Sequence, residues 1–130
     1  YGVEQGPSRP EAFGVEAATN REPLQSSSDA MNAVTLAPEN VDYVVRLIRA
    51  TRSHGDLAIG ASPRAAVLLG NAARVRAAVD GREYVVPDDI KALATATLRH
   101  RLVLSAAAEI EGRDVEAIVG DLIESTEAPR

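Results

Sequence analysis

Arg64 is the residue of this sequence whose type and position could do chemistry. It stands in "IGASPRAAVLLGNAARVRAA", residues 59–78, on the first turn of an expected helix. The helix dipole favours anions at that end, so a cation there costs roughly 0.3 to 1 kcal/mol when no anion is near. A helix N-terminus attracts phosphate, however, and a guanidinium offers phosphate a planar fork of donors. Arg64 is therefore either a phosphate-facing group or an ordinary surface arginine.

The other candidate chemical groups have structural explanations. Asp88 and Asp89 are adjacent, so on a helix they point in different directions, and their place on a first turn predicts charge that complements the dipole. Ser62 lies outside a GxSxG pattern and suits an N-cap, whose side chain accepts a bond from a free backbone amide. His54 and His100 stand far apart in a chain without cysteine, so we expect no metal site.

No phosphate-cradling loop occurs in this sequence. The patterns GxxxxGK[ST] and GxGxxG are both absent from the 130 residues. We therefore expect no nucleotide hydrolysis from this chain alone.

The element that would position Arg64 is a helix with both ends marked. Ser62 and Pro63 suit its start, because the amide hydrogen that proline lacks is not needed there, and Gly81 suits its end. Arg64 falls at the edge of the expected apolar side. The residues expected on that side are Ala65, Leu68, Leu69, Ala72 and Val79.

Three further helices are predicted from periodicity and end signals. One starts at Pro38, ends near His54 and Gly55, and carries one apolar stripe formed by Val41, Val44, Val45 and Ile48. Another starts at Pro87, buries Ile90, Leu93, Ala94, Thr97 and Leu98, and ends in the cationic residues 99–101. Asp114 caps the last, whose buried face is Val115, Ile118, Val119 and Leu122. Residues 84–86 and 102–104 read as short extended segments.

The expected fold is mostly α, a small bundle of about four helices with one or two short extended segments. Hydrophobic residues make up 45% of the chain and aromatics only 3%, so Ala, Val, Leu and Ile must form the core. Residues 1–28 read as a linker or loosely ordered arm and residues 29–130 as one domain, which opens with a short helical turn at 29–33. Because the chain begins at Tyr1, we expect a piece of a longer protein.

Charge and composition also limit the partners. A net charge of −5 argues against a general binder of nucleic-acid backbones. No apolar run is long enough to span a membrane, and no cysteine is present. We expect a cytoplasmic protein with neither a nucleic-acid nor a membrane partner.

Several spaced motifs resemble one known family. Residues 57–104, "LAIGASPRAAVLLGNAARVRAAVDGREYVVPDDIKALATATLRHRLVL", contain a G-A-S-P-R-A helix start, a GR-x-YV-x-P-D-D step and an L-x-HRL segment. These are similar to the C-terminal helical lid of AAA+ ATPases of the MoxR type. The likeness extends upstream through "VDYVVRLIRATR" (41–52) and more loosely through 108–123, over somewhat more than half of the chain, and it leaves out 1–28.

The resemblance implies a specific role for Arg64. In that family the arginine of the S-P-R step is the sensor 2 residue, which reaches the terminal phosphates of ATP held by a P-loop catalytic domain. ATP and Mg²⁺ would thus be bound through that missing domain, in the same subunit or a neighbouring one. The family also implies hexameric rings with chaperone-like remodelling activity, ATP hydrolysis by the full-length protein, and partners with von Willebrand factor A domains. Arg52 and Arg101 could contact nucleotide or a neighbouring subunit, or serve as cations at helix C-termini.

Two functions of other classes remain open from the residues alone. The order of helices and short strands could form a winged-helix DNA-binding module, although its recognition helix, residues 88–98, offers two aspartates and only Lys91 as a cation. A plain helical protein-interaction domain is the other alternative, and in it Arg64 has no special role.

Overall fold

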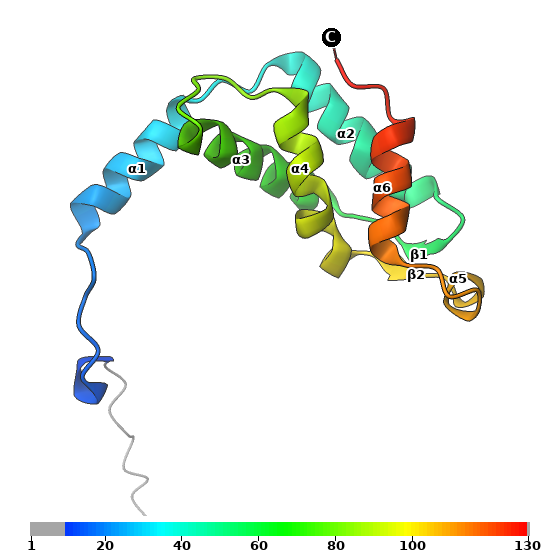
Figure 1. Ribbon diagram of the computed structural model, residues 1–130, viewed down its shortest axis with the longest axis horizontal. Coiled ribbons are helices and arrows are strands. Elements are labelled where there is room, and N and C mark those ends of the chain that lie inside the picture. The colour runs from blue at the N-terminus through cyan, green and yellow to red at the C-terminus, as the bar shows by residue number, and fades with distance from the viewer. Residues whose placement is uncertain (1–9, 130) are drawn as a thin grey trace, which may run out of the picture.

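Four helices pack into a bundle in the computed structural model, which describes residues 10–129. They are α2 (Pro38–Ser53), α3 (Pro63–Val79), α4 (Pro87–Leu98) and α6 (Val115–Ser125). The α3 helix packs against α2 and α4, while α6 closes the bundle against α2 and α4 (Figure 1). The mostly helical fold expected from the sequence is confirmed.

Proline sets the start of three of these helices. Pro38, Pro63 and Pro87 each occupy the first helical turn, where a missing amide hydrogen costs nothing. The predicted end of α2 near His54 is also correct. The starts of these three helices are therefore predictable from the sequence.

Short elements accompany the large helices. Strands β1 (Leu57–Ile59) and β2 (Val103–Leu104) pair antiparallel, and β2 confirms the extended segment predicted at 102–104. The segment predicted at 84–86 contributes only an isolated parallel bridge between Tyr84 and Thr35. Two short 3₁₀ helices, η1 (Pro10–Phe13) and η2 (Arg99–Arg101), and the five-residue helix α5 (Ala106–Ile110) complete the fold.

The core consists of aliphatic side chains and one tyrosine. Tyr43, Leu47, Leu69, Ile90 and Ile118 are fully buried where the four large helices meet. The buried face of α3 is narrow and carries small residues, which lets the neighbouring helices approach closely. Its members are Ala65, Leu69, Gly70, Ala73 and Ala77.

The predicted buried face of α3 was partly wrong. Leu68 is 36% exposed and Val79 is 79% exposed. The true face repeats every four residues from Ala65, so both residues fall outside it.

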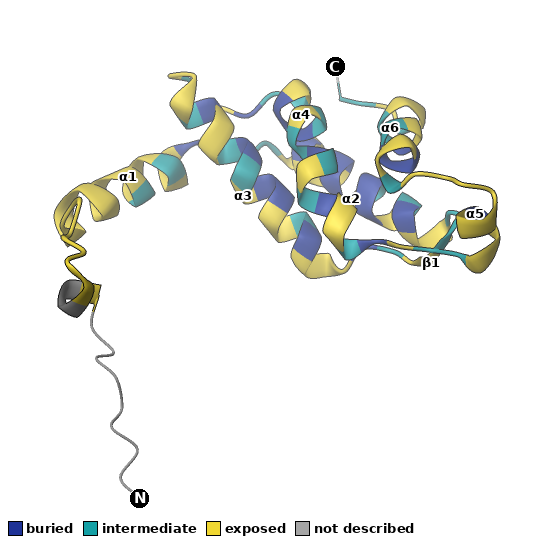
Figure 2. Cartoon of the chain, turned by 60° about the horizontal axis from the view of Figure 1, so that its bottom comes forward, coloured by how far each residue is buried: buried dark blue, intermediate teal, exposed yellow. Residues whose placement is uncertain are grey.

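Helix α1 (Arg21–Ala33) extends away from the bundle, and none of its residues is buried (Figures 1 and 2). The sequence predicted only a short turn at 29–33, so the helix begins eight residues before the expected point. Its last turn lies beside the end of α3. With α1 and α5, the described residues contain six α-helices where about four were expected. The rest of the expected arm, residues 1–9, lies outside the described residues.

The length and hydropathy of each helix decide whether it could cross a membrane. Within residues 10–129, no helix combines the length and the apolar character needed to cross a bilayer.

Candidate functional site

Arg64 lies on the first turn of α3 with an exposed side chain. Within residues 10–129 it takes part in no ion pair, whereas Arg76 and Arg82 near the other end of α3 both pair with Asp80. An arginine carries five N–H donors, and those of Arg64 remain available to solvent or a ligand.

The loop that precedes α3, residues 60–62, is hydrogen-bonded to the last turn of α2. The Thr51 hydroxyl donates to the Ile48 carbonyl at 2.7 Å and accepts from the Ala61 N–H at 2.9 Å. Arg52 Nε donates to the Ala61 carbonyl at 2.8 Å. Thr51 and Ala61 are fully buried, so the bonds between them are shielded from water. The start of α3 is thereby fixed relative to α2.

Gly60 allows the same loop to touch the α2 backbone. A Cβ at this position would lie 2.7 Å from the Cα of Arg52 and 2.7 Å from the carbonyl oxygen of Thr51. Both neighbours are backbone atoms, so no side chain could move aside. Gly60 is required for close approach rather than for a positive φ.

Ser62 occupies the predicted N-cap position, but its side chain makes no capping hydrogen bond. The expectation of a serine side-chain cap is therefore wrong. The first turn is closed instead by the backbone, since the Ala65 N–H donates to the Ser62 carbonyl at 2.9 Å. Pro63 stands at the start of the helix as predicted, and its fixed φ favours the helical conformation there.

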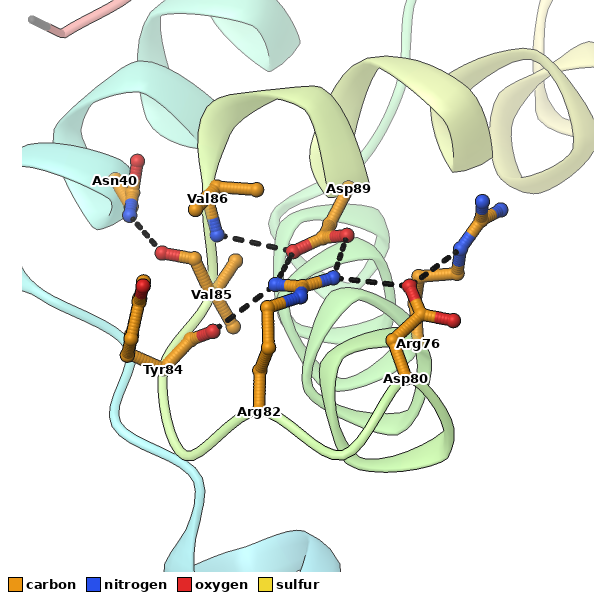
Figure 3. Close-up of polar contacts among 8 residues, drawn as sticks. All are labelled: Asn40, Arg76, Asp80, Arg82, Tyr84, Val85, Val86 and Asp89. Carbon is orange, nitrogen blue, oxygen red and sulfur yellow. Dashed lines mark hydrogen bonds and ion pairs between the residues drawn. The ribbon is translucent and has the colours of Figure 1, made fainter.

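A second charged cluster lies at the other end of α3, and Figure 3 shows its contacts. Arg82 Nη1 and Nη2 donate to the two carboxylate oxygens of Asp89 at 2.8 and 2.6 Å. Arg82 also donates to Asp80 at 3.0 Å and to the Tyr84 carbonyl at 3.1 Å. The Val86 N–H donates to Asp89 at 2.9 Å, which closes the first turn of α4. This cluster ties the connection between α3 and α4 into one rigid unit.

The cluster shifts the titration of both partners. The hydrogen bonds from Arg82 lower the pKa of Asp89 below its ordinary value of 3.8; burial opposes this shift, and the bond from Val86 adds to it. The bond to Asp89, followed by the bond to Asp80, raises the pKa of Arg82. Asp89 is therefore a buried structural carboxylate, and Asp88, whose side chain is 87% exposed, points elsewhere. The two do not form a catalytic pair.

The remaining predicted cations have mostly local partners. Arg101 donates to the Thr97 carbonyl at 3.1 Å, as a cation at a helix C-terminus does. Arg76 is exposed, and its Nε lies 3.4 Å from Asp80 Oδ2. His54 accepts a bond from the Asp56 N–H at 3.2 Å. Over the described range 10–129, no three His, Cys, Asp or Glu side chains are grouped to hold a metal ion.

Sequence reasoning missed the residues that hold the two ends of α3. Thr51 continues the apolar stripe of Val44 and Ile48 at helical spacing, and a polar residue on such a stripe signals an internal hydrogen bond. Arg82 and Asp89 both stand in the GR-x-YV-x-P-D-D step, but nothing in their spacing shows that the chain folds back between them. Their pairing becomes visible only from the structure.

Three comparisons place this chain among known proteins. Residues 49–122, more than half of the chain, match the model of the AAA lid domain family. The protein YeaC of Bacillus subtilis (strain 168), named as uncharacterized, is 40% identical over 88 residues, which cover 68% of this chain and 28% of that protein. Chaperone MoxR1 of Mycobacterium tuberculosis (strain ATCC 25618 / H37Rv) is 35% identical over 122 residues, which cover 82% of this chain and 32% of that protein.

A solved structure is also similar to this chain in fold and sequence. The crystal structure named "putative ATPase" from Cytophaga hutchinsonii superposes with a TM-score of 0.75 and 31% sequence identity, over 78% of this chain and 34% of that one. The chain thus spans about a third of the length of the proteins it matches.

Proposed function

Since this chain belongs to the AAA lid domain family and is the C-terminal lid of a MoxR-type AAA+ ATPase, we propose that Arg64 is its sensor 2 arginine. In this role it contacts the terminal phosphates of ATP held by the P-loop domain of the same protein. Because the chain belongs to the AAA lid domain family, the winged-helix DNA-binding module is no longer a candidate function. The observation that carries the proposal is the exposed side chain of Arg64, which has no ion-pair partner among residues 10–129. It stands on a helix whose start is hydrogen-bonded to α2.

Helix electrostatics support this role. The first turn of α3 carries the positive end of the helix dipole. Arg64 adds a full positive charge to that end, and no ion pair among residues 10–129 offsets it. Such an arrangement has its lowest energy with an anion beside it. A phosphate chain supplies that anion and accepts two parallel hydrogen bonds from the guanidinium.

The anchoring of the loop supports a catalytic contribution as well as binding. Stabilisation of a transition state depends on a charge that is already in place before the reaction. The bonds of Thr51 and Arg52 to Ala61 fix where α3 begins, and Arg64 follows three residues later. Mg²⁺ and the phosphate-binding loop, supplied by the catalytic domain, would neutralise the other phosphate charges.

The family supports further parts of the proposal. As the lid of an AAA+ ATPase the chain has the catalytic domain as its partner, and the assembly is a ring, proposed here as a hexamer with chaperone-like remodelling activity. A protein with a von Willebrand factor A domain is proposed as a further partner, and the cytoplasm as the location. The motif likeness of residues 57–104 is the support for these points.

The test uses the full-length ATPase. Arg64→Gln should lower kcat for ATP hydrolysis by about 100-fold, the effect of removing one donor aimed at developing charge. Arg76→Gln on the same helix is the control, because Arg76 is also exposed to solvent but lies near the far end, and it should retain wild-type kcat. Wild-type hydrolysis by a folded Arg64→Gln protein would rule out the sensor role.

Mixed assemblies then distinguish the two possible sites of action. Arg64→Gln subunits are combined with subunits whose P-loop lysine is changed. If Arg64 acts on nucleotide in its own subunit, each subunit type is inactive and mixing restores nothing. If it acts on a neighbour's nucleotide, mixing restores part of the activity, because an intact arginine then faces an intact P-loop.

A further inference from the structure

An apolar groove runs between α2 and α3. One part of it has a volume of about 280 Å³ and is lined mainly by valine, leucine and alanine side chains. A second part, of about 200 Å³, continues from the first, since Val45 and Ala66 line both. Val41, Val45 and Val67 on its walls are 43%, 39% and 62% exposed. Apolar surface of this kind is costly to leave in water.

Arginines stand at both ends of the groove. Arg74 lines the end near the start of α2, and Arg49 and Arg52 line the end near Pro63. Among the lining residues that the structure describes, none is Asp or Glu. The chain as a whole carries a net charge of −5, so the groove is cationic on an acidic protein. Its charge complements an anionic partner.

Arg74 lacks the partners that a paired arginine has. Its Nε atom is buried and has no hydrogen-bond partner within residues 10–129. Arg74 is half-buried, and of its nitrogens only Nε is among the buried atoms without a partner. The terminal nitrogens of the guanidinium are therefore the ones that a carboxylate at this end of the groove would pair with.

We propose that the α2/α3 groove binds an acidic amphipathic helix of a protein partner. Apolar side chains of that helix would cover Val41, Val45 and Val67, and carboxylates near its two ends would pair with Arg74 and Arg49. The twelve residues from Pro63 to Arg74 span about 16 Å, which is eleven steps at the helical rise, so the partner segment is about three turns long. Apolar anchors at i, i+4 and i+7 would follow the floor of such a groove.

The separation of the cations favours a helix over a nucleotide in this groove. A triphosphate concentrates its charge at one end, whereas the groove has cations at both ends with apolar wall between them. Arg64 lines neither part of the groove, so this proposal does not rest on the proposed sensor role.

The test titrates the chain with a fluorescein-labelled peptide and follows anisotropy. The peptide has about twelve residues, with leucine at i, i+4 and i+7, glutamate at both ends and alanine elsewhere. Saturable binding is expected, and Arg74→Gln should weaken it about tenfold through the loss of a charge-assisted hydrogen bond. Val67→Ser should weaken it as well. Val75→Ser is the matched control, since Val75 is an exposed valine of α3 outside the groove, and it should bind like wild type.

Three results would overturn the proposal. The first is the absence of saturable binding to wild type. The second is equal binding of a peptide with glutamine in place of each glutamate, which would remove the acidic requirement. The third is displacement of the peptide by ATP, which would assign the groove to nucleotide. Urea unfolding of each variant confirms that the fold is unchanged.

Discussion

Arg64 and Arg82 flank the same helix but are held in opposite ways. Arg82, just beyond the end of α3, binds both oxygens of Asp89, whose side chain is 5% exposed, and also contacts Asp80. Arg64, at the start, has no carboxylate partner among residues 10–129, although the loop beneath it is firmly bonded. Arg82 therefore serves the fold, with its partners inside the chain. In the role proposed for Arg64, a fixed backbone and a free side chain are what a ligand contact requires.

The largest loss of stability should follow from breaking the contacts between Arg82 and Asp89 beyond the end of α3. Asp89→Ala removes the acceptor of two charge-assisted bonds and of the bond from Val86, and it leaves Arg82 without its main partner. The free energy of unfolding should fall by about 2 to 3 kcal/mol, measured by urea denaturation. Asp88→Ala is the control, because Asp88 is exposed, and it should change the free energy by less than about 0.5 kcal/mol. Equal effects would show that the cluster does not hold the fold.

The same carboxylate predicts a pH dependence. The pKa of Asp89 is lowered in the folded protein, so the unfolded chain takes up the proton first as the pH falls. The stabilising contribution of Asp89 is therefore present above its ordinary pKa of 3.8 and is lost as the pH falls toward the lowered folded value. Unfolding free energy below that pH should fall more steeply for wild type than for Asp89→Asn. Parallel curves for the two proteins would contradict this.

A slightly smaller loss should follow from forcing the Arg64 loop away from α2. Gly60→Ala places a Cβ 2.7 Å from backbone atoms of Thr51 and Arg52, so the loop must move. Overpacking of this kind costs about 1 to 3 kcal/mol, measurable by urea denaturation. Gly55→Ala in the same connection is the matched control, because nothing lies within 4 Å of its Cβ position. If both variants unfold at the same urea concentration, the loop at Gly60 has room for a Cβ beside the α2 backbone, and the contact does not require glycine.

Removal of one hydroxyl from the anchor should have a lesser effect. Thr51→Val preserves the shape of the side chain but leaves the Ala61 N–H without its acceptor. We expect a loss of about 1 to 2 kcal/mol in thermal or urea unfolding. Thr95→Val on α4 provides a comparison at a half-buried threonine. A Thr51→Val protein as stable as wild type would show that the anchor is carried by Arg52 and Gly60 instead.

Sequence reasoning placed the four large helices but not the contacts that fix them. The starts of α2, α3 and α4 were predictable because proline restricts its own backbone, a property of one residue. The Arg82 and Asp89 pair, the Thr51 bond and the Gly60 contact each join residues from separate elements, so they depend on how the chain folds. The α1 helix was underestimated because its polar, serine-rich sequence has few apolar residues, and none of its residues is buried. The serine cap failed because the backbone already closes that turn.

The smallest effect on folding should come from changing Arg64. The variant Arg64→Gln also tests whether Arg64 contacts the terminal phosphate of ATP. Arg64→Gln should change the free energy of unfolding by less than about 0.5 kcal/mol, since the side chain is exposed and unpaired. The decisive measurement is the affinity of the full-length Arg64→Gln ATPase for a non-hydrolysable ATP analogue and for ADP, by isothermal titration. Affinity for the ATP analogue should fall at least about tenfold, through the loss of one charge-assisted contact, while affinity for ADP should stay within about twofold. Unchanged affinity for the ATP analogue, or an equal loss for both nucleotides, would contradict a role for Arg64 at the terminal phosphate.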